Sequence, residues 1–333
     1  TQSVYADPAV DAVVITTRHD AHAAMVCDAL RAGKHVFVEK PLALTAAQVD
    51  EIESVHAAAS AGGRAPILMV GFNRRFAPQV RKVHSLLRGV VGPKSFVMTV
   101  NAGAIPAEHW TQDRATGGGR IIGEGCHFID LLRHLAGAPI TGLSAVSMES
   151  SQRDTVTMSM SFTDGSVGAV HYFANGPKSF PKERLEVFAA GGVLQLDNFR
   201  KLRSFGWPGF RAMNLWRQDK GQRDCARAFV DAVAGRSPTP IPVDEVFEVA
   251  RASIRAALGQ VGGADRRACH LEDLVHGNRR RGAAGNRLDE GARAVALARV
   301  LAPEVHGAEP GPSDAAQLAE GVELQLAAGG DDL

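Results

Sequence analysis

The stretch DAVVITTRHDAHAAMVCDALRAGKHVFVEKP, from Asp11 to Pro41, decides the fold that the sequence predicts. Residues Ala12 to Ile15 and His35 to Val38 form short, continuous runs of mainly apolar side chains, and such runs predict strands that are buried on both faces. The residues between them, from about Ala21 to Ala32, predict a helix. Because this connection is too long for a hairpin, we expect the two strands to be parallel neighbours in one sheet.

The segments that follow repeat this order. Residues from about Thr45 to Ser60 predict a second helix, and the apolar run from Ile67 to Phe72 predicts a third strand. The order β-α-β-α-β is one half of a doubly wound sheet that binds dinucleotides. We therefore expect residues 1–76 to form the carboxyl-terminal half of a Rossmann-like domain.

From about residue 77 the hydrophobic pattern changes to a period of two, with turn signals such as Asp164-Gly165 and Gly191-Gly192 between the segments. The alternating segments are KSFVMTVNAG, GLSAVSMES, DTVTMSMSFTDGSVGAVHYFANG and RLEVFAAGGVLQL. Helical patterns lie in NRRFAPQVRKVHSLLRG, GGGRIIGEGCHFIDLLRHLAG, DCARAFVDAVAG and VDEVFEVARASIRAAL. The predicted fold class is therefore α/β: a partial Rossmann-like parallel sheet, followed at residues 77–258 by an α+β domain with a large, mostly antiparallel sheet.

Residues 259–333 differ in composition from the rest of the chain. They contain no aromatic residue and no Lys, Ile, Met or Thr, although the whole chain has 14 Phe, 3 Trp and 2 Tyr. A segment of this kind has little to bury in a shared core. We expect a poorly ordered, low-complexity tail with at most one helix, near GARAVALARVL; out-of-frame translation of a gene rich in G and C would give a similar composition.

The overall composition argues against several classes of partner. A formal charge of +1 over 333 residues gives no global field that would attract nucleic acid or an anionic membrane, so we expect neither as a partner. No apolar run approaches the ~18–20 residues of a membrane span. The four cysteines are far apart without a C-x-x-C pair, which favours neither a disulfide framework nor a cysteine zinc site and makes a reducing cytoplasm the expected location.

Three motifs at these separations resemble the Gfo/Idh/MocA family of NAD(P)-dependent oxidoreductases. They are TTRHDAHAAMVCDALRAGKHVFVEKPLALT, VGFNRRFAP and GGGRIIGEGCHFIDLLRHLAG, and the similarity runs through roughly residues 5–258. The sequence from about Gly103 to Asp130 is most similar to a bi-domain subset of the family, in which this unit follows a zinc-alcohol-dehydrogenase-like portion. The resemblance implies NAD or NADP as cofactor, a sugar, sugar derivative or polyol as substrate, and a homo-oligomer formed through the sheet of the second domain.

The resemblance implies two catalytic residues. The lysine of E-K-P would lie beside the nicotinamide and the reacting carbon, and a histidine on the second domain's helix would exchange the hydroxyl proton; these positions are Lys40 and His127. The chemistry is consistent, because hydride loss from an alcohol needs a base for the O–H proton and a cation near the oxygen. An imidazole, with an ordinary pKa of ~6.5, can exchange a proton near neutrality. The alternatives are a solvated lysine at a strand end and a histidine buried in an ordinary helix.

One position departs from the family pattern. The family often has an Asp four residues before the histidine, where this chain has Gly123 followed by Glu124. Glu124 would point about 100° away on an α-helix. Asp130, three residues after His127, shares its helix face more nearly and is therefore a third catalytic candidate, which would orient the imidazole. A surface or capping carboxylate is the alternative for Asp130.

The resemblance also implies residues that bind cofactor and substrate. The turn TTRHDAH follows a strand along the cofactor, and E-K-P and the NRR that follows the third strand face the same crevice. The cofactor candidates are Thr16, Thr17, His22, Glu39, Lys40, Asn73 and Arg74. Side chains suited to hydrogen bonding or stacking with a sugar or polyol are Asn101, His109, Trp110, Arg120 and His127. Trp110 could equally close a domain interface, and Asp20 could cap the helix that follows it.

The phosphate-binding G-x-G-x-x-G does not occur at the start of this sequence, and GGGRIIG follows no strand. The resemblance therefore implies an amino-terminally truncated chain, with this loop before residue 1. Two other functions stay open. One is a non-catalytic protein of the same fold that binds a metabolite or a partner. The other is a metal-dependent hydrolase that uses His109, His127 and Asp130, although we expect no metal because their spacing matches no compact metal motif.

Overall fold

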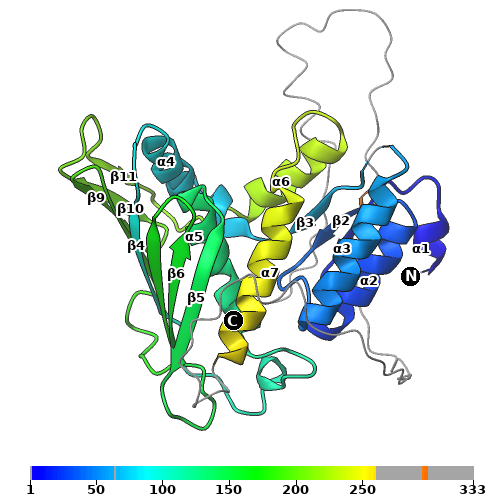
Figure 1. Ribbon diagram of the computed structural model, residues 1–333, viewed down its shortest axis with the longest axis horizontal. Helices are drawn as coiled ribbons and strands as arrows, with labels where there is room; N and C mark the ends of the chain where they lie inside the picture. Colours follow the sequence, from blue (N-terminus) through cyan, green and yellow to red (C-terminus); the bar gives the residue numbers. More distant parts are fainter. Residues whose placement is uncertain (1, 64, 260–294, 299–333) are drawn as a thin grey trace, which may run out of the picture.

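The structure, a computed structural model, describes residues 2–63, 65–259 and 295–298, and it contains two sheets with helices between them (Figure 1). The smaller sheet has the strand order β12-β1-β2-β3. Strands β1 (Ala12–Ile15), β2 (His35–Val38) and β3 (Leu68–Val70) are parallel to one another, as the sequence predicts. Their carboxyl ends therefore meet at one edge of the sheet, where ligands bind in open α/β sheets.

Two helices connect these strands: α2 (His19–Arg31) and α3 (Ala46–Ser60). The start of α3 is fixed by a capping box, in which the Thr45 hydroxyl accepts from the Gln48 N–H at 3.2 Å and the Gln48 side chain accepts from the Thr45 N–H at 3.1 Å. This cap holds the chain shortly after the E-K-P segment that follows β2. A short helix, α1 (Gln2–Ala6), precedes β1 and buries Tyr5.

Two details of this sheet differ from the sequence prediction. The third strand ends at Val70 rather than Phe72, because the chain turns at once into a short 3₁₀-helix, η1 (Asn73–Phe76). The prediction of a helix near GARAVALARVL is wrong for residues 295–298, which form the strand β12 (Val295–Ala298). This strand pairs antiparallel with β1 and covers the outer edge of the sheet, where partnerless N–H and C=O groups would be costly. The rest of the predicted tail lies outside the described residues, apart from Gly259.

The larger sheet has eight strands in the order β11-β10-β9-β8-β4-β7-β6-β5. Only β4 and β7 pair in parallel within it, so the prediction of a mostly antiparallel sheet is confirmed. The strands are β4 (Ser95–Asn101), β5 (Ile140–Ser147), β6 (Val156–Phe162), β7 (Val167–Phe173), β8 (Glu183–Ala189), β9 (Gly192–Asp197), β10 (Lys201–Phe205) and β11 (Ala212–Asn214). Strands β10 and β11 extend the predicted set.

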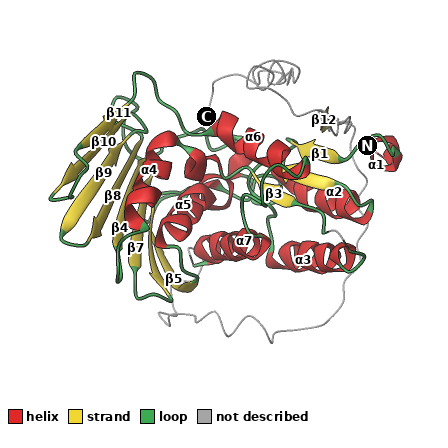
Figure 2. Cartoon of the chain, turned by 90° about the horizontal axis from the view of Figure 1, so that it is seen from above, coloured by secondary structure: helices red, strands yellow, loops and turns green. Residues whose placement is uncertain are grey.

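Four longer helices lie between the two sheets (Figure 1, Figure 2). They are α4 (Pro78–Leu87), α5 (Cys126–Ala136), α6 (Gln222–Val233) and α7 (Val243–Leu258). Helix α7 packs against α5 beside the larger sheet and against α3 beside the smaller one. A π-helical turn, η3 (Ile121–Gly125), leads directly into α5, and a 3₁₀ turn, η2 (Trp110–Gln112), lies in the loop before it. The ends of β1, β2 and β3 therefore face η3 and α5 across the middle of the molecule.

Candidate functional site

The E-K-P segment lies at the carboxyl end of β2, as the sequence predicts. The Glu39 N–H donates to the Ile15 carbonyl at 2.8 Å, which joins the start of this segment to the end of β1. The Glu39 side chain lies over Gly71, where a Cβ would stand 3.0 Å from Oε1, so a larger residue at position 71 would crowd the carboxyl group. Burial raises the pKa of Glu39, and the neighbouring Lys40 opposes that rise.

His22 contacts the backbone of the same segment. Its side chain is completely buried, with Nδ1 2.7 Å from the Pro41 carbonyl and Nε2 3.0 Å from the Thr17 carbonyl. Burial lowers the pKa of His22. Both ring nitrogens lie within hydrogen-bond distance of backbone carbonyls, of which the neutral ring donates to one, so any contribution of His22 to cofactor binding goes through the position of Pro41 and Thr17. The Thr17 hydroxyl itself donates to the Arg18 carbonyl at 3.3 Å.

His127 lies at the start of α5 and faces a positively charged environment. It is buried, and its Nδ1 has no hydrogen-bond partner among the described residues. Burial lowers the pKa of His127 well below the ordinary value, and positive charges lower it further; in decreasing order these are Arg74, Lys40, Lys220 and Lys182. The imidazole is therefore in its neutral, proton-accepting form at neutral pH, and the surrounding cations make it a weaker base than a free imidazole. A buried nitrogen without a partner costs free energy that a ligand or water could recover.

Asp130 does not contact the His127 imidazole. Its carboxylate receives the Arg75 guanidinium through both oxygens, with Nε 3.1 Å from Oδ2, and Arg75 also reaches Glu245 at 3.1 Å. All three side chains are largely buried. The expectation that Asp130 orients the imidazole is therefore not met, because a buried guanidinium competes for the same carboxylate more strongly than a neutral ring.

Asn73 and Arg74 follow β3, as predicted; Asn73 contacts the loop before α6, and Arg74 reaches β8 of the second sheet. The Asn73 amide donates to the Lys220 carbonyl at 2.9 Å. Arg74 makes a bidentate ion pair with the buried Glu183, with both N–O distances 2.9 Å, and its guanidinium lies 4.8 Å from the centre of the Phe128 ring. Arg74 is thus committed to Glu183 and contributes its charge beside His127 rather than an open hydrogen-bonding edge.

The structure explains why the position four residues before His127 is a glycine. A Cβ at Gly123 would stand 2.9 Å from Cε1 of His19, which comes from the amino terminus of α2. The His19 ring is fixed there by a 2.8 Å hydrogen bond between Nδ1 and the Gly117 carbonyl and by the edge of Trp110, with ring centres 4.7 Å apart. Trp110 is also covered by Arg18, so it packs at the junction of the two sheets rather than standing free.

Gly123→Asp is therefore expected to destabilise the fold by roughly 1–3 kcal/mol, the usual cost of overpacking a filled site. It would not restore the carboxylate that the family often has at this position. Chemical denaturation measures the change. Gly89→Asp is the matched control, since a Cβ there meets nothing within 4 Å, and His19→Ala combined with Gly123→Asp should recover much of the loss. Wild-type stability of Gly123→Asp would contradict the packing that we describe.

Three further substrate candidates hold loops in place. The Asn101 amide donates to the Pro177 and Phe180 carbonyls at 2.8 and 3.1 Å. Arg120 donates to the Gly103 and Ala102 carbonyls, pairs with Glu124 at 3.2 Å and stacks on Tyr172. His109 Nδ1 lies 2.8 Å from the Thr111 hydroxyl. These contacts shape the loops around the crevice, and their direct contact with substrate stays a prediction.

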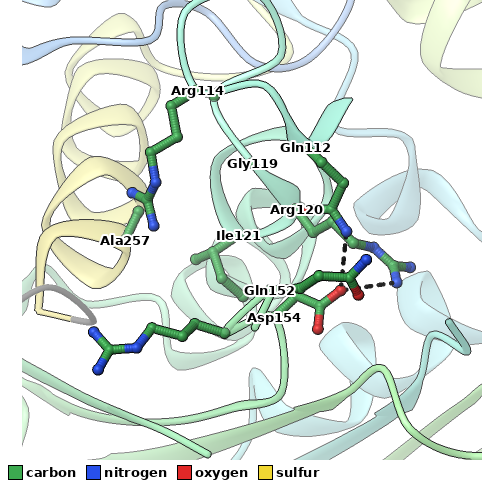
Figure 3. Close-up of a pocket in the computed structure, with 10 residues that line it drawn as sticks. Gln112, Arg114, Gly119, Arg120, Ile121, Gln152, Asp154 and Ala257 are labelled. Carbon is green, nitrogen blue, oxygen red and sulfur yellow. Dashed lines mark hydrogen bonds and ion pairs between the residues drawn. The ribbon is translucent and has the colours of Figure 1, made fainter. Parts of the chain in front are cut away.

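A small hollow lies beside Arg120 (Figure 3). Within it Arg120 and Asp154 approach to 3.8 Å and Gln112 donates to Asp154 at 3.2 Å, while Arg114 extends toward Ala257. Neither Lys40 nor His127 lines this hollow. No three His, Cys, Asp or Glu side chains in the described part of the chain gather closely enough to hold a metal ion.

Sequence reasoning missed two lysines and gave too little weight to Glu124. Lys182 precedes β8 and pairs with Glu124 at 2.9 Å, and Lys220 precedes α6 and pairs with Glu183 at 2.8 Å. Burial alone would raise the pKa of Glu124, but Lys182, the Tyr172 hydroxyl and Arg120 lower it to about 2. The π-helical turn invalidates the 100° argument against Glu124, because that angle holds only for an α-helix. Neither lysine lies in a motif that could have signalled it.

A half-Rossmann sheet followed by a large open sheet defines a class of two-sheet α/β proteins, and comparison with known proteins places the chain within it. Residues 1–72 match the family described as oxidoreductase family, NAD-binding Rossmann fold, and residues 80–195 match the GFO/IDH/MocA C-terminal domain. Together the two matches cover more than half of the 333 residues. The chain belongs to the Gfo/Idh/MocA family of oxidoreductases.

Individual relatives agree with this assignment. The chain is 28% identical over 204 residues to the uncharacterized oxidoreductase YrbE of Bacillus subtilis, covering 58% of this chain and 57% of that protein. It is also 28% identical to the myo-inositol 2-dehydrogenase of Thermotoga maritima, covering 59% of each. Levoglucosan dehydrogenase in complex with NADH and levoglucosan has a similar fold, with a TM-score of 0.67, 23% identity and coverage of 77% of this chain and 80% of that one.

The chain spans somewhat more than half the length of these two curated relatives. In the part of the chain that the structure describes, no helix combines the length and apolar character that crossing a membrane requires.

Proposed function

We propose that the whole protein is an NAD(P)-dependent oxidoreductase that transfers a hydride between the nicotinamide and a hydroxyl-bearing carbon of a sugar, sugar derivative or polyol. The observation that carries this proposal is that Lys40, at the carboxyl end of β2, lies near enough to the buried His127 on α5 for its charge to help lower the pKa of the imidazole. A cation from the first sheet and a neutral imidazole from α5 thus lie in one neighbourhood.

The residues at the strand ends fit a nicotinamide cofactor. Thr16 and Thr17 follow β1, Glu39 and Lys40 follow β2, and Asn73 follows β3, so these residues lie along the edge at which doubly wound sheets bind dinucleotides. The partnerless Nδ1 of the buried His127 supports this proposal, because a ligand could satisfy a hydrogen-bonding group that has no protein partner among the described residues. Bound nicotinamide would supply the acceptor or donor of the hydride. NAD and NADP are both proposed.

The chain's own residues divide the remaining work. The neutral imidazole of His127 accepts the hydroxyl proton as the substrate is oxidised. Lys40 stabilises the negative charge that develops on the substrate oxygen. His22 and Glu39 fix the backbone on either side of Lys40, through the Pro41 and Ile15 carbonyls. We propose residues 1–76 as the cofactor part, residues 77–258 as the substrate part and residues 259–333 as a tail of which Val295–Ala298 (β12) joins the smaller sheet.

Two finer assignments accompany this function. The sequence from Gly103 to Asp130 supports placement in the bi-domain subset with a zinc-alcohol-dehydrogenase-like portion. The side chains of Val167, Phe188 and Phe205 are exposed and align with one another across neighbouring strands of the larger sheet, through Ser95 and Val193. This apolar row supports a homo-oligomer formed through that sheet, because a surface row of this kind is costly to leave in water.

The test is spectroscopic. The full-length gene product should reduce NAD⁺ or NADP⁺ when it is given a panel of sugars and polyols, and the double variant Lys40→Ala/His127→Ala should not. A protein that binds the cofactor and a sugar yet reduces neither cofactor would support the non-catalytic alternative instead.

A further inference from the structure

Two lysines from separate loops of the second sheet reach the charged cluster beside His127. The Lys182 ammonium is 2.9 Å from Oε1 of Glu124, which is three residues before His127. The Lys220 ammonium is 2.8 Å from Oε1 of Glu183, which also binds Arg74. Proton transfer at His127 assigns no role to either lysine.

Both loops are built to hold the lysines where they are. The Asn101 N–H donates to the Lys182 carbonyl at 2.7 Å, and the Asn101 amide fixes the preceding residues through Pro177 and Phe180. The Lys220 carbonyl accepts from the Asn73 amide at 2.9 Å, and Asn73 directly follows β3. Each lysine is thus attached by its backbone as well as by its ammonium, so its position costs little ordering on ligand binding.

The charged side chains of this cluster differ in their exposure to solvent. The Glu183 side chain is fully buried and faces two cations, whereas the Lys220 and Lys182 side chains keep 17% and 29% of their surface exposed. Glu124 likewise faces Lys182 and Arg120, and Arg120 also reaches Asp154 at 3.8 Å. Glu183 is therefore the fully buried member of this cluster, whereas Lys220, Glu124 and Lys182 keep 17%, 21% and 29% of their side-chain surface exposed. With Lys40 and Arg74, the net effect at His127 is a positive field.

A neutral sugar or polyol would not be attracted by this positive field. Desolvating ammonium groups against neutral hydroxyls is costly, whereas a carboxylate or phosphate on the substrate would be attracted and held by charge-assisted hydrogen bonds. We propose that the substrate is an anionic sugar or polyol derivative, whose carboxylate or phosphate is bound by Lys182 and Lys220 while its hydroxyl-bearing carbon lies at His127. This inference rests on the proposed function and adds the charge of the substrate to it.

The first experiment uses the wild-type full-length protein and matched sets of compounds: glucose with glucuronate and glucose 6-phosphate, and galactose with galacturonate and galactose 6-phosphate. We expect kcat/KM for at least one anionic member to exceed that of its neutral parent by about tenfold or more, and the advantage to shrink as salt is added. The two kinds of anion separate a carboxylate from a phosphate preference. Equal or better use of the neutral parents would overturn the inference and leave the proposed function intact.

The second experiment uses Lys182→Gln and Lys220→Gln, with Lys201→Gln on the exposed part of β10 as control. Each of the first two should raise KM for the preferred anion several-fold, with little change in kcat/KM for its neutral parent or in NADH affinity. Lys182→Arg should restore much of the loss and shows that the fold is retained. A loss of NADH affinity in place of the KM effect would assign the lysines to the cofactor and overturn the inference.

Calorimetry in the presence of NADH separates this inference from the proposed function. Binding of glucuronate or glucose 6-phosphate that depends on Lys182 and Lys220, without any turnover, would support an anion-recognising site and refute the dehydrogenase. Turnover of neutral compounds alone would support the dehydrogenase and refute the anion-recognising site. Failure of every compound in both sets to bind or react would contradict both.

Discussion

Lys40→Ala is expected to lower turnover of the full-length protein by ~10²-fold or more at every pH, the size of effect seen when a donor that stabilises a transition-state oxyanion is removed. The lysine ammonium stabilises the oxygen whether or not His127 has received the proton. The loss should therefore appear as a vertical displacement of the pH–rate profile. Steady-state kinetics with a reactive sugar or polyol derivative, from pH 5 to 10, measure it.

Lys178→Ala, an exposed lysine in the loop before β8, is the control and should keep wild-type turnover. Lys40→Arg retains the charge but not the compact ammonium, so it should recover only part of the rate. A Lys40→Ala variant with full turnover would remove the cation from the mechanism. A loss confined to one end of the pH range would instead make Lys40 the titrating base.

His127→Ala is expected to fail differently, with a loss of ~10²–10⁴-fold near neutral pH that lessens as hydroxide becomes available at high pH. In the wild-type protein, burial and the surrounding cations lower the pKa of His127 well below 6.5. The base form therefore persists below pH 6.5, and the acid limb of the profile that His127 controls should lie below that value. NADH affinity should change little, because His127 lies on α5, beside the second sheet.

His56→Gln, a substitution on α3, is the control for loss of a partly buried imidazole and should leave both kcat and its pH dependence unchanged. Wild-type turnover in His127→Ala would leave Lys40, or a residue outside this chain, as the proton acceptor. A constant loss at all pH values would assign His127 a binding role rather than proton transfer.

The parallel strands and the long helices could be predicted from local pattern. β1 and β2 coincide with the predicted runs because continuous apolar strands between turn signals have few other stable arrangements in a globular fold. Helices α6 and α7 likewise follow the predicted stripes. β12 could not be predicted, because Val295–Ala298 resembles a helix locally and becomes a strand by pairing with β1, more than 280 residues away in sequence.

The candidate site divides in the same way. Lys40 and His127 were found from motifs, and the structure places both in one electrostatic environment. The roles of Asp130 and Arg74 could not be read from sequence, because their partners are 55 and 109 residues away. Helix periodicity assigned Asp130 to His127, but periodicity contains no information about Arg75 on η1. Lys182 and Lys220 could not be predicted for the same reason, since only the folded chain brings them to Glu124 and Glu183.

The most direct test of hydride transfer follows the hydrogen itself. The full-length protein is incubated with oxidised cofactor and a reactive sugar or polyol derivative that carries deuterium on the hydroxyl-bearing carbon, and the reduced cofactor is examined by NMR. We predict that the deuterium appears at carbon 4 of the nicotinamide, in proportion to the substrate oxidised, and that His127→Ala slows its appearance most near neutral pH. Reduced cofactor without deuterium, or deuterium found only in the solvent, would contradict the account.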